Sequence, residues 1–258
     1  MGSAFFWGAV SGFAVLLGAV VSMIINIPKK VLGFIMAFGV GILIGAATFE
    51  LLQDAMEKSH IINTIIGFIA GALTFTILEA VIAHHGGKHR KRSNQHELNQ
   101  EDEQAEKQHA KNSGNDSGLG IFIGTVMDAI PESMMLGMSL IGGKGVSMLL
   151  LIAIFISNIP EGLSSTTGML KSGQSKGKII FLFAVVTLVA GLSALFGYVF
   201  LDGASMSVIS IISSFAAGGI ITMIGSTMMP EAYEEGGGLV GLMTAFGVIT
   251  SILLDQLG

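Results

Sequence analysis

Carboxylates within apolar stretches are the residues best able to do chemistry in this sequence. Asp128 and Glu132 lie four positions apart in one apolar stretch, and the next stretch carries Ser157, Asn158 and Glu161. A proline directly precedes each of the two glutamates. An acid at membrane depth is energetically costly and is a functional-site hypothesis by default. Two such acids in matching sequence frames predict a shared cation site.

The donor set indicates which cation this site would take. These side chains offer carboxylate, amide and hydroxyl oxygens, which hard or borderline divalent cations accept. Carboxylates gathered in a medium of low dielectric constant repel one another, and neither stretch contains a Lys or Arg to relieve that repulsion. The prolines each remove a helical hydrogen bond and free a carbonyl near the acids. A divalent cation would therefore complete the site.

Composition identifies the class of protein around this site. The chain is 51% hydrophobic and 12% charged, with a mean hydropathy of +0.74. A soluble domain carries about 25% charged residues. The sequence contains no cysteine, which excludes disulfides and thiolate ligands. We therefore expect a single all-α polytopic membrane domain over residues 1–258, with lipid and a metal cation as its partners and no nucleic acid.

Hydropathy and basic residues predict the topology. Eight apolar stretches are long enough to cross a bilayer: about 4–26, 31–56, 61–84, 118–141, 145–170, 177–201, 205–231 and 237–257. Eleven of the thirteen Lys and Arg residues fall in alternate connecting loops, and only Lys58 and Lys144 fall in the others. The positive-inside rule then predicts that both termini are extracytoplasmic.

An internal repeat is also predicted. The stretch from Gly41 to Ala55 runs parallel in sequence to the stretch from Gly218 to Ala232, although the two spans cross the membrane in opposite directions. Repeats of inverted topology are the usual construction of secondary transporters. The expected architecture is an inverted 3+2+3 arrangement of eight helices, with chance similarity between apolar segments as the alternative.

The long connection after the third span differs from the rest of the chain. Residues 85–117 contain almost no apolar side chains, which predicts a disordered cytoplasmic loop. His84, His85 and His89 lie in or beside it. Imidazoles are common transition-metal ligands, so these histidines either capture metal weakly or belong to a solvated linker.

Three further acids are candidates for accessory or pathway roles. Glu50 and Asp54 lie near the predicted outer end of the second span, where they either attract cations or are simply solvated. Glu231 follows Pro230 at the inner end of the seventh span, where it is either an exit ligand or the end of a helix.

The paired motifs resemble those of the ZIP (Zrt/Irt-like) divalent metal transporters, of bacterial type, over essentially the whole chain. In that family each central helix commonly reads His-Asn-x-Pro-Glu. Asp128 and Ser157 take the histidine places here, Asn158 takes an asparagine place, and Glu132 and Glu161 match the glutamates. Ala129 takes the other asparagine place, where its side chain cannot coordinate metal.

The departures from the family pattern bear on the metal. No imidazole is present in either motif, and the predicted sixth span has no acid that could complete a second metal position. One metal is therefore expected rather than two. Carboxylate and carbonyl donors suit manganese and iron, whereas zinc also accepts carboxylates and cadmium is a further candidate.

The resemblance implies a transporter that carries divalent metal into the cytoplasm by alternating access, without an organic cofactor. It also implies a homodimer, and compact loops favour a bacterial cytoplasmic membrane. The alternatives are a metal sensor or degenerate transporter that binds without turnover, and a membrane metalloenzyme that activates water. No catalytic motif appears in the sequence, so we expect no enzyme.

Overall fold

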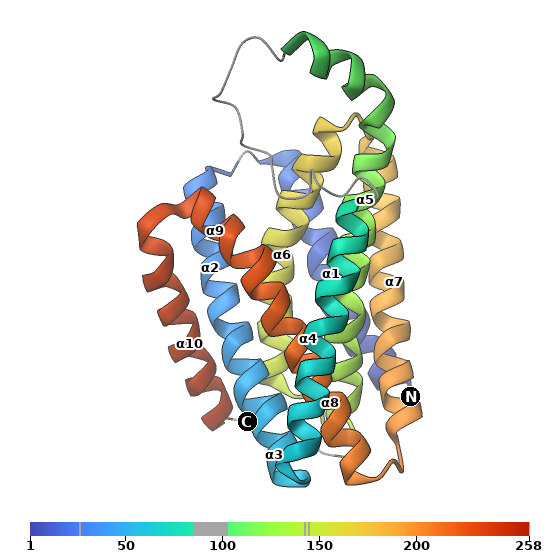
Figure 1. The fold of residues 1–258 in the computed structure, drawn as a ribbon, viewed down its shortest axis with the longest axis vertical. Coiled ribbons are helices and arrows are strands. Elements are labelled where there is room, and N and C mark those ends of the chain that lie inside the picture. Colours follow the sequence, from blue (N-terminus) through green and yellow to red (C-terminus); the bar gives the residue numbers. More distant parts are fainter. Residues whose placement is uncertain (26, 85–102, 142, 144, 258) are drawn as a thin grey trace.

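The chain forms a bundle of long helices (Figure 1). The computed structural model describes residues 1–25, 27–84, 103–141, 143 and 145–257. Among these residues there is no strand. The helices are α1 (Gly2–Ile24), α2 (Lys29–Gly45), α3 (Asp54–Lys58), α4 (Ile61–His84), α5 (Glu103–Ser139), α6 (Met148–Lys171), α7 (Lys176–Leu201), α8 (Met206–Met223), α9 (Met229–Gly236) and α10 (Val240–Leu257). The prediction of an all-α protein is thus confirmed.

Seven segments in the described part of the chain are long and apolar enough to cross a membrane. Six of them correspond one to one to the first six predicted spans. The seventh, Met206–Gln256, is 51 residues long and contains both α8 and α10. The chain reverses direction within it, after α9, where Gly237 adopts a φ of 71° that a side chain would oppose (Figure 1).

Serine residues define where three of these helices begin. The hydroxyls of Ser147, Ser175 and Ser205 each accept a hydrogen bond from the backbone N–H three residues later, at the start of α6, α7 and α8. Such caps satisfy amide groups that have no partner within the helix. The starts of these helices are therefore encoded locally in the sequence.

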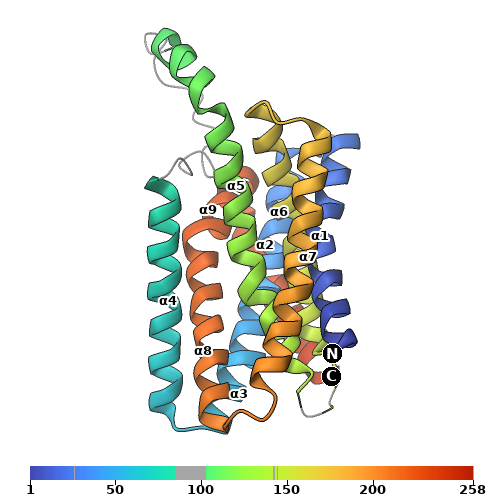
Figure 2. The ribbon, with the colours of Figure 1, turned by 90° about the vertical axis from the view of Figure 1, so that its right-hand side faces the viewer.

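The helices pack in a small number of extensive pairs. Helix α1 packs against α6 and α7, while α5 packs against α7 (Figure 2). Helix α4 lies along α8, and α10 lies along α2. The main hydrophobic core includes Leu43, Leu136, Ile154 and Ile220, all fully or almost fully buried, so α2, α5, α6 and α8 meet around it.

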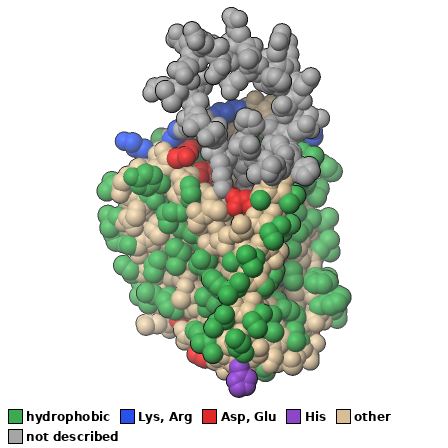
Figure 3. Space-filling view, viewed as in Figure 1, with side chains coloured by type: hydrophobic (Ala, Val, Ile, Leu, Met, Phe, Trp, Pro, Cys, Tyr) green, Lys and Arg blue, Asp and Glu red, His purple; other side chains and the backbone are tan. Residues whose placement is uncertain are grey.

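Apolar side chains are spread over the side of the bundle that faces the viewer in Figure 3. The most exposed stripe on α4 comprises Ile62, Ile66, Ile69, Leu73 and Ile77. Apolar residues on the outside of a helix bundle are expected where the surrounding medium is lipid. Lys and Arg side chains gather instead at the upper end of the molecule in this view.

Connections alternate between the two ends of the bundle. The turns after α1 and α6 lie at the upper end, and the turns after α3 and α7 lie at the lower end (Figure 1). Both termini lie toward the lower end. The loops in which the sequence concentrates Lys and Arg follow the same alternation.

The predicted loop over 85–117 is described only in its second half. Helix α5 begins at Glu103 and thus includes residues 103–117, whereas 85–102 lie outside the described residues. The disorder of this loop stays a prediction.

Two helices continue directly into a π-helical segment. The segment Ala46–Gln53 lies between α2 and α3, and the segment Ile224–Met228 lies between α8 and α9. π-Helical turns break the regular hydrogen-bond ladder and occur frequently at functional sites. The two segments fall within the two sequence stretches that the repeat hypothesis pairs.

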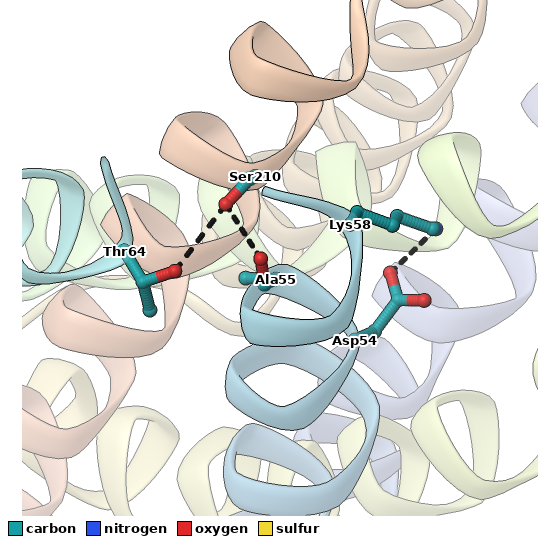
Figure 4. Close-up of polar contacts among 5 residues, drawn as sticks. All are labelled: Asp54, Ala55, Lys58, Thr64 and Ser210. Carbon is teal, nitrogen blue, oxygen red and sulfur yellow. Dashed lines mark hydrogen bonds and ion pairs between the residues drawn. The ribbon is translucent and has the colours of Figure 1, made fainter. Parts of the chain in front are cut away.

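A buried hydroxyl joins α3, α4 and α8 (Figure 4). Ser210 of α8 donates a 2.8 Å hydrogen bond to the carbonyl of Ala55 in α3. Its hydroxyl also lies 3.3 Å from that of Thr64 in α4, and both residues are buried. Beside this group, Lys58 and Asp54 form an exposed ion pair of 2.6 Å.

Ser210→Ala is expected to lower the free energy of unfolding by about 1 to 3 kcal/mol, because it leaves the buried carbonyl of Ala55 without its donor. Thermal unfolding in detergent measures this change. The control is Ser207→Ala on the same helix, where an exposed hydroxyl accepts a 3.3 Å bond from Ser59. That variant should stay within about 0.5 kcal/mol of the wild type. Equal effects of the two substitutions would contradict the role given to Ser210.

Candidate functional site

The first predicted motif lies in the membrane-embedded part of α5. Asp128 and Glu132 are both 2% exposed, one turn apart on the same helix. Pro131 lies inside this helix, directly before Glu132. Proline interrupts the backbone hydrogen bonding of the preceding turn. The structure therefore buries both acids beside an irregular turn of backbone.

The second motif lies in α6. Ser157 and Asn158 are buried, Glu161 is partly buried, and Pro160 lies inside the helix. The Ser157 hydroxyl donates a 3.0 Å hydrogen bond to the carbonyl of Ile154 within its own helix. Its oxygen retains a lone pair that remains available to a cation.

Glu132 is the point at which the two motifs meet. A side-chain hydrogen bond joins it to Asn158 of α6. The charges of Asp128 and Glu161 are both close enough to act on its carboxylate. The fold thus brings together four of the predicted site residues, which the sequence separates by up to 33 positions.

The electrostatics of Glu132 favour a cation. Its Oε2 atom is buried and has no hydrogen-bond partner among the described residues. Burial and two neighbouring acids both oppose a negative charge at this position. A metal ion or a proton relieves this repulsion.

The carboxylates are not gathered into a compact cluster. Within the described residues, no group of three or more His, Cys, Asp or Glu side chains is arranged to hold a metal ion. Asn158 and Ser157 offer an amide oxygen and a hydroxyl oxygen in addition to these side chains.

The accessory residues lie at the two ends of the bundle. At the lower end, Glu50 hydrogen-bonds to the side chain of Ser147, which also caps α6. Asp54 is engaged there in the ion pair with Lys58. At the upper end, Glu231 of α9 accepts a hydrogen bond from Ser164 of α6. The sequence prediction for these acids did not include either serine partner.

The predicted histidines lie outside the part of the chain whose side chains the structure describes. His85, His89 and the side chain of His84 lie outside the described residues, although the backbone of His84 ends α4. Their capture of metal stays a prediction.

Sequence reasoning did not identify Ser11 of α1 as part of this site. Its carbonyl accepts a 3.2 Å hydrogen bond from Nδ2 of Asn158. Its hydroxyl lies 3.4 Å from that of Ser133, the neighbour of Glu132. A serine within an apolar span is a weak signal, and a contact made by backbone carbonyl has no side-chain signature at all.

The family model described as "ZIP Zinc transporter" matches residues 1–235. A protein of Arabidopsis thaliana named "Putative zinc transporter" is 24% identical over 223 residues, which is 85% of this chain and 33% of the relative. The chain therefore spans about a third of the length of this curated relative.

Proposed function

The chain belongs to the ZIP zinc transporter family, which implies divalent metal transport, and we propose that it carries a divalent cation into the cytoplasm between α5 and α6. The observation that carries this proposal is the burial of Glu132 among Asp128, Asn158 and Glu161. The family and the name of the relative point to a transporter rather than an enzyme.

The residues proposed to bind the cation are Asp128, Glu132, Asn158 and Glu161, with Ser157 as a weaker donor. All offer oxygen atoms, so we propose a single metal of the manganese, iron or zinc type, with cadmium as a further substrate. Because the carboxylates do not form a compact cluster, binding would draw α5 and α6 together. A change in the separation of two helices on binding is the kind of movement that alternating access requires.

Glu50 and Glu231 would serve the two ends of the pathway. Glu50 hydrogen-bonds at the start of α6, below the site, while Glu231 contacts Ser164 one turn above Glu161. Beyond Glu231, the carboxylate of Glu235 lies within range of the positive charges of Lys29 and Lys171. We propose that the cation enters past Glu50, and past Asp54 when it is released from Lys58, and leaves past Glu231.

An inverted 3+2+3 repeat of eight spans is part of this proposal. A Cβ on Gly247 of α10 would lie 2.2 Å from the carbonyl of Phe38 in α2. A Cβ on Gly71 of α4 would lie 1.8 Å from the carbonyl of Phe215 in α8. Phe38 and Phe215 occupy equivalent positions, each three residues before the glycine that begins its paired stretch (Gly41 and Gly218).

Helix contacts and π-helical segments support the same repeat. In this repeat α1, α2 and α4 correspond to α7, α8 and α10, and α5 corresponds to α6. Exchanging the two halves therefore converts the contact of α2 with α10 into the contact of α8 with α4. It likewise converts the contact of α1 with α6 into that of α7 with α5. The π-helical segments that follow α2 and α8 are also exchanged. With α8 and α10 counted separately, both termini fall on the extracytoplasmic side, and a homodimer in a bacterial cytoplasmic membrane completes the proposal.

The test is metal uptake by the purified protein in sealed proteoliposomes, from a panel of zinc, manganese, iron(II), cobalt and cadmium. We expect uptake that protein-free vesicles lack, with manganese or iron transported at least as well as zinc because imidazole is absent from the site. Metal binding without uptake in any member of the panel would favour a sensor. Neither binding nor uptake would overturn the proposal.

A further inference from the structure

Helix α1 lies against the candidate site but has no role in the proposal so far. It contains no charged residue. Its Ser11 is fully buried, and the Ser11 carbonyl accepts the 3.2 Å hydrogen bond from Asn158 Nδ2. A neutral helix thus contacts one of the proposed ligands through its backbone.

The amide of Asn158 makes two contacts with acceptors. One is the carbonyl of Ser11, and the other is the carboxylate of Glu132. An amide nitrogen carries two hydrogens, and neither a carbonyl nor a carboxylate can donate. The nitrogen therefore serves both acceptors, and the amide oxygen is left as the atom that a cation can bind.

Close approach of α1 and α6 makes the contact between Ser11 and Asn158 possible. A Cβ on Gly18 would lie 2.2 Å from the carbonyl of Ile159, the residue after Asn158. From the other helix, a Cβ on Gly162 would lie 2.1 Å from the carbonyl of Val15. Small residues permit such backbone contact between membrane helices. A methyl group at either glycine would force the two helices apart.

Helix α1 also reaches α5 at the same level. The hydroxyl of Ser11 donates a 2.8 Å bond to the carbonyl of Gly8 and lies 3.4 Å from the hydroxyl of Ser133. Ser133 is buried and follows Glu132 directly. One turn of α1 therefore contacts both of the helices that carry the proposed ligands.

We propose that Ser11 is a positioning residue whose backbone carbonyl orients the Asn158 amide so that its oxygen faces the transported cation. This inference rests on the proposed function. Ser11 acts through Asn158 and does not itself contact the metal. Groups that orient metal ligands typically change metal affinity by about 10- to 100-fold when they are lost.

The experiment measures equilibrium binding of zinc and of manganese to the purified full-length protein in detergent. Gly18→Ala is expected to weaken binding by about tenfold, because it moves the Ser11 carbonyl away from Asn158. Gly71→Ala is the matched control: it introduces a comparable backbone clash, 1.8 Å from the Phe215 carbonyl, between α4 and α8. Binding by this control should stay within about twofold of the wild type, since no proposed ligand lies on either helix.

A double-mutant cycle separates positioning from a general loss of structure. In the Asn158→Ala background, Gly18→Ala should change metal affinity by less than about twofold, because the residue through which α1 acts is absent. If Gly18→Ala yields no folded protein, Gly162→Ala replaces it and separates the same two helices from the other side.

Equal metal binding by Gly18→Ala and Gly71→Ala would overturn the inference. If the wild type binds metal in the same experiment, the proposed function stays intact. An effect of Gly18→Ala that persists in full without Asn158 would also overturn the inference. A wild-type protein that binds neither zinc nor manganese would overturn the proposed function itself, and this inference with it.

Discussion

Replacing Glu132 with glutamine is expected to abolish metal uptake, whereas Glu79→Gln should leave uptake close to that of the wild type. Both substitutions remove one carboxylate from a membrane-spanning helix and preserve its shape. Glu132 is buried beside Asp128, Asn158 and Glu161, whereas Glu79 lies on α4, apart from the site. Removing one partner from a buried charged pair costs about 2 to 5 kcal/mol, or roughly 30-fold to several thousand-fold in binding.

Glu132→Gln should not lower the thermal stability of the protein, although it should abolish transport. The wild-type site holds several acids in a medium of low dielectric constant, and Oε2 of Glu132 has no hydrogen-bond partner among the described residues. Glutamine removes one charge from this group. The thermal midpoint of the metal-free variant should therefore equal or exceed that of the wild type.

Uptake at fixed external metal concentration, measured beside thermal unfolding, checks both parts of this prediction. Glu161→Gln should behave in the same way, because its charge acts on the same site. If Glu132→Gln transports metal at the wild-type rate, its carboxylate is not a ligand. If it fails to transport only because it is unfolded, the midpoint will fall rather than rise.

Gly247→Leu is expected to destabilise the protein by about 3 kcal/mol or more, because leucine overfills the contact between α10 and α2. Even a Cβ at this position would lie 2.2 Å from the Phe38 carbonyl and 2.8 Å from Cα of Gly41. Helix α10 carries its own control at Gly241, where a Cβ would meet no atom within 4 Å. Gly241→Leu should unfold within about 0.5 kcal/mol of the wild type.

The same substitution tests the repeat. Gly71 of α4 meets the Phe215 carbonyl as Gly247 meets that of Phe38, so Gly71→Leu should destabilise by a similar amount. Thermal unfolding in detergent and the yield of monodisperse protein report both effects. A large loss at Gly247 with none at Gly71 would indicate that the two halves do not pack as an inverted repeat.

Much of the architecture could be predicted because burial in a membrane is a property of composition. An apolar stretch of sufficient length must satisfy its backbone hydrogen bonds internally, and so it becomes a helix wherever it occurs. The prediction that Asp128, Glu132 and Glu161 matter followed from the same rule, since acids are rarely retained in such stretches. The start of α6 at Ser147 was likewise encoded within a few residues.

Contacts between helices could not be predicted in this way. The bond between Ser164 and Glu231 joins residues 67 positions apart, and the contact of Asn158 with Ser11 joins residues 147 apart. Both depend on which faces of the helices meet, which composition does not specify. The Ser11 contact uses a backbone carbonyl, a group that every residue has, so no residue type could have marked it.

Sequence alone therefore determined that this is a helical membrane protein with acids in its apolar segments. The tertiary structure decided which groups surround those acids. Hydrophobicity acts on each segment separately, whereas the orientation of a ligand depends on how closely two backbones approach. Here that approach is set by Gly18 and Gly162, whose missing side chains bring α1 against α6.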